Sequence, residues 1–338
     1  MKMLLRLLPV LLITLTIAGC SETNSPAWKG KLYYNFTSDV KSYDFATKAE
    51  KKLFDNATQP FVVKSGEIYF MDDNYRKRNV LVRKTNASFT QFKNVLDMSS
   101  ENPDYKEQLE NYSIINNTGI SAVLSKMSDP KVSPDGKYLS VTIFGYKGQA
   151  FENDCVGVFD LATGKLVTKF EHKYYGSWTP DNRLVMSGTY KSNSTDGKPY
   201  EAKTPGIFLS DASLQNLTRI DEELDDPSPY HAAVSPDGKK VAFILNNHVW
   251  VMDINGKNMK QLTDADNDNV ETFPTWSPDG KNIATWTYKT FEKSYYTAIA
   301  IVPANAPKPV ALTNKAPVWP RDTKGYRLSG GSMQLNWK

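Results

Sequence analysis

The chain has 338 residues, enough for one large domain or two modest ones. Hydrophobic residues make up 40% and charged residues 23%, which is ordinary globular usage and excludes wholesale disorder. The net charge of +4 is a small excess for this length, so no nucleic-acid partner is expected.

The first element in chain order is an export signal. Two basic residues precede an apolar run over residues 7–18, which is too short to span a bilayer but fits a signal-peptide core. The run ends in IAGC at Ile17–Cys20, and small residues before a Cys at this distance resemble a bacterial lipobox. The resemblance implies removal of residues 1–19 and attachment of diacylglyceryl and palmitate-type chains to Cys20. A plain secretory signal is the alternative.

The residue after the lipobox bears on location. Ser21 follows Cys20, whereas an Asp there would usually retain a lipoprotein at the inner membrane of Gram-negative bacteria. The resemblance therefore implies an outer-membrane anchor with the protein facing the periplasm, and residues 20–30 as a lipidated linker. Cys155 lies in an apparent strand and is expected to be a small buried hydrophobe.

A repeated unit occupies most of the remaining chain. Its clearest copy, at Ala232–Thr263, reads as strand, turn, strand, short loop, strand, turn, strand. The turn string SPDGK occurs at Ser133–Lys137, Ser235–Lys239 and Ser277–Lys281. Counting a diverged turn near residue 180, the turn prolines are 46, 56 and 42 residues apart. Four strands at this period are typical of a β-propeller.

Counting half-units predicts the number of blades. Six first halves begin near residues 61, 130, 176, 232, 273 and 317, and six second halves near residues 40, 79, 156, 206, 249 and 298. The earliest second half has no first half before it, so it completes one blade with the last first half, which contains Pro320. The prediction is an all-β, six-bladed propeller of four-stranded antiparallel blades, closed by strands from both termini.

Three segments leave alternatives open. Residues 31–36 and 333–337 are each candidates for an extra strand in the closing blade. The segment 97–128 shows no clear alternation, and we interpret it as an insertion. Seven blades would result if it contained a diverged repeat.

One stretch resembles a known family. Val249–Trp286 combines VWVMDI, a Gly and LT with PTWSPDG and IATW, and this order and spacing are similar to the propeller repeat of the TolB family. Looser copies cover about residues 40–320. The resemblance implies a single TolB-like propeller over residues 31–338 and a place in the cell envelope. The α/β domain that precedes the TolB propeller has no counterpart between Cys20 and the first repeat half.

The long loops are the expected binding surface. They gather on the face opposite the SPDG turns and carry many aromatic and charged residues, which are common at protein interfaces. The candidate binding residues are Tyr146, Phe151, Tyr190, Tyr200, Tyr230, His231, Phe273, Tyr288, Phe291 and Tyr295.

Motifs for catalysis and cofactors are missing from the sequence. It has no G-x-S-x-G elbow, phosphate loop or dinucleotide fingerprint. The string at Asp264–Asp268 begins like a calcium loop, but Asn269 and Thr275 stand where Gly and Glu are needed. The three His have no ligand spacing. We therefore assign no catalytic residue, metal or cofactor.

These observations favour an outer-membrane-anchored, monomeric protein-binding or scaffold module that presents its loop face to another envelope protein. The alternative is a carbohydrate-binding or carbohydrate-active propeller, which the Tyr-rich loops would suit.

Overall fold

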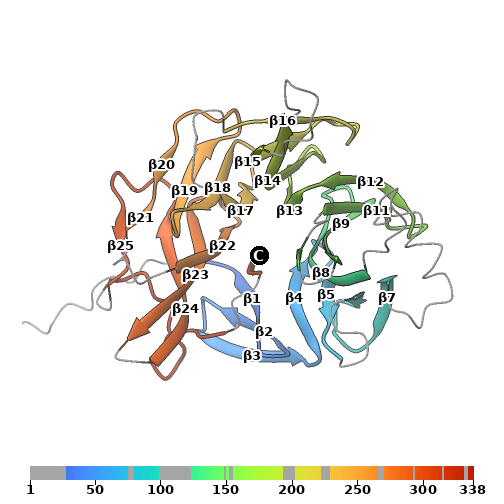
Figure 1. Cartoon of the computed structure of the whole chain (residues 1–338). Coiled ribbons are helices and arrows are strands. Elements are labelled where there is room, and N and C mark those ends of the chain that lie inside the picture. Colours follow the sequence, from blue (N-terminus) through green and yellow to red (C-terminus); the bar gives the residue numbers. More distant parts are fainter. Residues whose placement is uncertain are drawn as a thin grey trace, which may run out of the picture.

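The protein is an all-β ring. The computed structural model describes residues 28–74, 80–98, 123–147, 150–151, 155–192, 202–221, 229–264, 270–291, 294–313, 316–330 and 334–338. Every regular element among them is a strand, and no helix there is long and apolar enough to cross a membrane. The strands form six blades around a central axis (Figure 1). The predicted six-bladed propeller is thus confirmed, and the seven-bladed alternative is wrong.

Each blade is an antiparallel sheet whose first-named strand lies nearest the axis. Blade 1 contains β26 (Asn336–Trp337), β1 (Lys31–Phe36), β2 (Asp39–Asp44) and β3 (Ala49–Phe54). Blade 2 contains β4 (Ala57–Val62), β5 (Ile68–Asp72), β6 (Leu81–Thr85) and β7 (Phe92–Asp97). Blade 3 contains β8 (Val123–Val132), β9 (Tyr138–Lys147), β11 (Cys155–Asp160) and β12 (Leu166–Glu171), with the short β10 (Ala150–Phe151) paired to β9.

The other three blades follow in chain order. Blade 4 contains β13 (Lys173–Trp178), β14 (Leu184–Ser192), β15 (Ala202–Ser210) and β16 (Leu217–Arg219). Blade 5 contains β17 (Tyr230–Val234), β18 (Lys240–Leu245), β19 (His248–Asp253) and β20 (Lys260–Gln261). Blade 6 contains β22 (Val270–Trp276), β23 (Asn282–Phe291) and β24 (Ser294–Pro303). A parallel pair, β21 (Thr263–Asp264) with β25 (Val310–Ala311), links blades 5 and 6.

Blade 1 closes the ring with strands from both ends of the described chain. Its inner strand β26 pairs antiparallel with β1, with Trp337 opposite Leu32. The ladder continues beyond the strand, since the Lys31 N–H donates to the Lys338 carbonyl at 2.5 Å and the Lys338 N–H donates back at 2.9 Å. The predicted closure is confirmed, and both segments that the sequence left open are strands of this blade.

The segment 317–328 differs from its expected role. It was predicted to be the first half of the closing blade, but that place is taken by β26 and β1. It instead follows the outer edge of β24, where Ile301 donates its N–H to Val318 at 2.8 Å and Ile299 donates to Leu328 at 3.2 Å. An exposed strand edge presents unpaired N–H and C=O groups. This segment covers the edge that a regular fourth strand protects in the other blades.

The residue range of the predicted insertion is shorter than expected, because strands occupy both of its ends. β7 reaches Asp97 and β8 begins at Val123, so the ends of the interval 97–128 belong to blades 2 and 3. Residues 99–122 lie outside the described part of the chain. Cys155 lies in β11 and is 7% exposed within an apolar cluster, as expected.

Every SPDGK string closes its hairpin in the same way. In the copy that begins at Ser235, the hydroxyl accepts the N–H of Lys240 at 2.9 Å and donates to Asp237 Oδ1 at 2.6 Å. Gly238 has a φ of 72°, which Gly adopts without a steric penalty. The same bonds recur in the copies that begin at Ser133 and Ser277. The repetition of the string therefore has a structural cause.

The hydrophobic core is divided among the contacts between blades. Six apolar clusters are present, and each combines residues from two neighbouring blades. Between blades 6 and 1, for example, the rings of Trp286 and Tyr34 meet edge to face with their centroids 5.9 Å apart. Each fully buried large side chain stabilises the fold by roughly 1.5–3 kcal/mol. Because the core lies between the blades, the axis is left for polar groups and a cavity.

Candidate functional site

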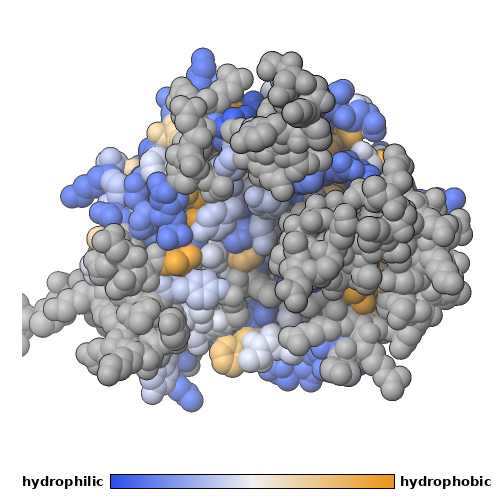
Figure 2. Space-filling model, in the orientation of Figure 1, coloured by the Kyte–Doolittle hydropathy of each residue, from blue (hydrophilic) through white to orange (hydrophobic). Residues whose placement is uncertain are grey.

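An axial cavity of about 910 Å³ lies where the inner strands meet. Its walls come from the inner strands of all six blades, and its mouth is bordered by exposed turn prolines at positions 134, 180, 236 and 278. Figure 2 shows a hollow near the middle of the face that it draws, with hydrophobic and hydrophilic residues beside it. Pockets of roughly 300–1,000 Å³ commonly bind small ligands or side chains. The cavity is therefore the candidate site.

Five inner strands carry a left-handed residue at one equivalent register. Each residue lies four positions before the first residue of its turn and has a φ between 51° and 56°; the five are Gln59, Asp129, Tyr175, His231 and Phe273. The pairing of each inner strand with its neighbour shifts at this point. Such bulges redirect a side chain and often border functional sites. Non-Gly residues rarely adopt this conformation, so the fold imposes it.

Gln334 occupies the sixth equivalent position. Two residues after it, Asn336 Oδ1 accepts the N–H of Val62 in the next blade at 3.2 Å. Two residues after Tyr175, Ser177 Oγ accepts the N–H of Val234 in the next blade at 3.0 Å. Because the two bonds lie at the same offset along their strands, Gln334 has the same register in its blade as the other five residues have in theirs. We call the six residues at this register the inner ring.

One half of the inner ring is polar. Gln59, Asp129 and Gln334 come from blades 1 to 3, and Gln59 Oε1 accepts the backbone N–H of Asp129. Lys131 Nζ lies 3.0 Å from Asp129 Oδ2 and donates to the Gly176 carbonyl at 2.8 Å. Burial raises the pKa of the Asp129 carboxyl, and the adjacent Lys131 ammonium opposes that rise.

Three atoms of this polar half have no partner. Asp129 is 2% exposed and Gln334 is 3% exposed, yet within the described part of the chain Asp129 Oδ1 and both amide atoms of Gln334 make no hydrogen bond. Both residues line the axial cavity. Leaving a buried polar group unsatisfied costs roughly 1–3 kcal/mol. Unpaired atoms that line a cavity indicate a place for a polar ligand.

The other half of the inner ring is aromatic. The rings of His231 and Phe273 stack with their centroids 3.8 Å apart and their planes 21° apart, and Tyr175 meets His231 edge to face at 4.2 Å. The Phe273 N–H donates to His231 Nδ1 at 3.3 Å, which assigns the imidazole proton to Nε2. Burial, and secondarily the charge of Lys131, lower the pKa of His231 to about 3. The aromatic half is therefore uncharged at neutral pH.

The turns around the mouth touch one another. The Asp135 N–H donates to Asn182 Oδ1 of the next turn at 3.2 Å. A Cβ on Gly238 would lie 2.8 Å from Pro180 Cδ, so these two turns are in close contact. We call the four turns at Ser133–Lys137, Thr179–Arg183, Ser235–Lys239 and Ser277–Lys281 the turn collar. It borders the mouth of the cavity.

The structure brings some of the predicted binding residues together. His231 and Phe273 belong to the inner ring, and Tyr230 packs edge-on against His231 with the centroids 4.8 Å apart. Tyr288 is half-buried in β23 and does not line the cavity. Strand backbones place Tyr146 (β9), Phe151 (β10), Tyr190 (β14), Phe291 (β23) and Tyr295 (β24), whose side chains are outside the description. Cys20 and Tyr200 lie outside the described residues. The loop-face site remains a prediction.

Sequence reasoning missed the polar half of the inner ring. Counting four residues back from each turn would have aligned Asp129 with Tyr175, His231 and Phe273. Gln334 has no such signal, because no turn of the repeat follows it. Lys131 lies in a strand, and the residues beside it in the sequence form no motif that would mark it as a functional residue.

The His residues lie in separate settings. His248 Nδ1 is 3.6 Å from Glu271 Oε1, and this nearby buried carboxylate raises the pKa of His248. His231 is in the inner ring, and His172 follows β12 with a φ of 56°. Among the residues that the structure describes, no three His, Cys, Asp or Glu side chains group to hold a metal ion.

Comparison with known proteins places the fold. No protein-family model and no curated protein matches the chain. A structure assigned as TolB from Agrobacterium tumefaciens is 14% identical, with 82% of this chain and 85% of that chain covered and a TM-score of 0.54. TolB from Acinetobacter baumannii is 17% identical, with 78% of this chain and 64% of that chain covered and a TM-score of 0.47. An oligogalacturonate lyase from Vibrio parahaemolyticus is 14% identical, with 82% of this chain and 72% of that chain covered and a TM-score of 0.41.

At these identities the comparisons bear on the fold alone. The Agrobacterium structure shows that the chain has a TolB-like β-propeller fold, as the repeat at Val249–Trp286 predicted. A fold of this kind supports many functions, so the site has to carry the functional argument.

Proposed function

We propose that this protein is a lipid-anchored binding module of the bacterial envelope that docks a protein partner on the turn collar. The observation that carries the proposal is the collar itself. Exposed prolines at positions 134, 180, 236 and 278 stand on turns that contact one another around the open cavity. Turns that already contact one another lose little conformational entropy on binding, which favours association.

The anchor and the compartment are supported by the sequence. The lipobox-like IAGC places an acylated Cys20 ahead of a short linker to the propeller, and Ser21 favours transport to the outer membrane. An acyl anchor would hold the ring close to the periplasmic side of the membrane. There the collar would meet other envelope proteins.

Site-specific photocrosslinking in the producing cells tests the docking surface. A photoreactive amino acid at Pro236 lies on the collar, whereas one at Val167, which is 43% exposed on the outer strand β12, is a matched control. We expect one discrete crosslinked envelope protein from position 236 and none from position 167. Equal crosslinking from both positions, or a partner captured only from position 190 on the other face, would contradict docking on the collar.

A carbohydrate-binding or carbohydrate-active role is the second candidate. It is favoured by one observation: unpaired polar atoms of Asp129 and Gln334 share a cavity with the stacked rings of His231 and Phe273. Aromatic faces opposite hydrogen-bonding groups suit ligands that have both apolar and polar sides.

A further inference from the structure

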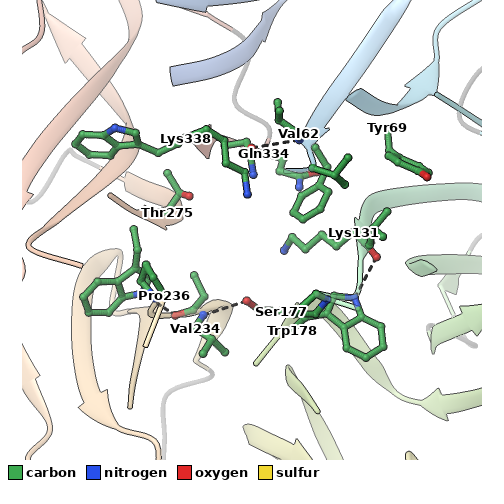
Figure 3. A pocket seen from close by; sticks show the side chains of 18 of the residues that line it. Val62, Tyr69, Lys131, Ser177, Trp178, Val234, Pro236, Thr275, Gln334 and Lys338 are labelled. Atoms are coloured by element: carbon green, nitrogen blue, oxygen red, sulfur yellow. Dashed lines mark hydrogen bonds between the residues drawn. The ribbon is translucent and has the colours of Figure 1, made fainter. Parts of the chain in front are cut away.

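The floor of the axial cavity offers a specific set of hydrogen-bonding atoms. Asp129 Oδ1 is a free acceptor, and the Gln334 amide has a free acceptor and two free donors. Lys131 projects its ammonium into the cavity, and its two hydrogen bonds leave a third N–H (Figure 3). Hydroxyl groups both donate and accept, so a ligand with several hydroxyls can satisfy all of these atoms.

The floor also offers aromatic side chains. His231 and Phe273 form one stacked pair, and Tyr175 borders it edge-on with 5.5 Å between the Tyr175 and Phe273 centroids. The faces of aromatic rings carry partial negative charge and attract weakly positive C–H groups. A ring that has C–H bonds on its face and hydroxyls at its edge would contact both halves of the inner ring.

The local charges indicate a neutral ligand. Asp129 and Lys131 form a pair within the wall, so neither presents an uncompensated charge. An anionic ligand at the floor would approach the free oxygen of Asp129, and a cationic one would approach Lys131. A buried charge without a compensating partner is costly in such a setting. Since His231 is uncharged, the aromatic half adds no preference for an ion.

We propose that the inner ring binds a neutral sugar ring, with the C–H face of the sugar against the half-buried ring of Phe273 and its hydroxyls on Asp129 Oδ1 and the Gln334 amide. This deepens the second candidate function and rests on it. It concerns the floor of the cavity and is independent of protein docking on the collar.

Binding is tested on the full-length protein purified from the envelope in detergent. The probes are glucose, galactose, mannose, N-acetylglucosamine and a β-1,4-linked glucose disaccharide, with galacturonic acid as the anionic comparison. Trp178 and Trp276 line the cavity, so tryptophan fluorescence and titration calorimetry both report occupancy. We expect at least one neutral sugar to bind, and galacturonic acid to bind more weakly than its neutral counterpart galactose.

Two variants assign the binding to the floor. Gln334→Leu removes the free amide and should weaken sugar binding by roughly tenfold or more, the equivalent of a lost pair of hydrogen bonds. Its folding should be retained or improved, because no hydrogen bond in the protein is lost. Gln215→Leu, at an exposed position on blade 4, is the matched control and should bind like the wild type.

Several results would overturn the proposal. One is no binding by any neutral probe at concentrations of tens of millimolar, and another is binding that Gln334→Leu and Gln215→Leu leave equally intact. Preference for galacturonic acid would indicate an anion site. A blocked neutral peptide that binds in a Gln334-dependent way while the sugars fail would indicate a peptide site. Crosslinking at Pro236 does not depend on these outcomes, so failure of the sugar site and failure of the docking surface can be told apart.

Discussion

His231 is held by Phe273 in two ways: the two rings stack at 3.8 Å, and the Phe273 N–H donates to His231 Nδ1 at 3.3 Å. Both contacts join blade 5 to blade 6. The hydrogen bond also requires an unprotonated Nδ1, because a protonated Nδ1 cannot accept a hydrogen bond. The contact therefore makes one blade interface sensitive to acid.

Acid should weaken the fold through His231. Its folded pKa of about 3 is below the ordinary value of 6.5, so the unfolded chain binds the extra proton between these two pH values. Stability is then lost as the pH falls from 6.5 toward 3, by an amount on the order of 5 kcal/mol at full extent. Urea unfolding of the wild type and of His231→Asn at several pH values checks this. The variant should show a shallower acid slope, and parallel slopes would contradict the assignment.

His248 should act in the opposite direction. The nearby buried carboxylate of Glu271 raises the folded pKa of His248 above 6.5, so the stabilisation is complete below pH 6.5 and is lost as the pH rises through the folded pKa. The effect should be below about 1 kcal/mol because the imidazole is part-exposed. His248→Gln should remove it, which the same unfolding series would detect. If the stability difference between the wild type and His248→Gln is the same at pH 6 as at pH 8, this pair is excluded as the cause.

Ring closure should depend on Gly30. Gly30 has a φ of 86°, and a Cβ there would lie 2.2 Å from the Lys338 carbonyl oxygen. Gly325 has a φ of 84° with nothing near its Cβ position, so Gly325→Ala is a matched control for backbone strain alone. We expect Gly325→Ala to cost roughly 1–2 kcal/mol and Gly30→Ala clearly more. Equal melting temperatures for the two variants would show that the blade 1 ladder tolerates the clash.

The three SPDGK turns should be energetically equivalent. Replacing Ser133, Ser235 or Ser277 by Ala removes the same two side-chain hydrogen bonds each time. Each change should cost about 1 kcal/mol, and the costs should add, since the substituted residues share no partner. Denaturant unfolding of the single and triple variants measures both effects. Strong non-additivity would mean that the turns act as one unit through their collar contacts.

Cys20 should determine membrane attachment. If the lipobox is processed, Cys20→Ser abolishes palmitate labelling and releases the protein from the membrane fraction. Cys155→Ser is the control, since that thiol is buried in β11 and is not available for acylation. Fractionation with radiolabelled palmitate distinguishes the two variants. Labelling that persists in Cys20→Ser would disprove the anchor.

The sequence was most informative where the structure is local and repeated. A Pro-Asp-Gly turn is determined by its own residues, so its recurrence predicted both the hairpins and the number of blades. Residues 317–328 retain a similar pattern but cover the edge of β24. Their expected place in the closing blade is taken by β26 and β1. Local patterns identify a candidate strand without identifying its partner.

The inner ring could not be predicted for a related reason. Its left-handed residues include Tyr175 and Phe273, whereas sequence rules expect Gly, Asn or Asp at such φ values. The conformation is imposed by the bulges of the inner strands. Gln334 and Asp129 are about 200 residues apart in sequence, and only closure of the ring brings them to the same cavity.

Pairing of β26 with β1 also changes how the blades can come apart. In linear arrays of repeats, the two terminal units have only one neighbour and need special polar caps. Here each apolar cluster lies between two blades and none is terminal, so all six blades are flanked on both sides. A single breach at the Lys31–Lys338 ladder would convert the ring into an open array with two uncapped ends. That junction therefore sets whether the protein unfolds all at once or frays blade by blade.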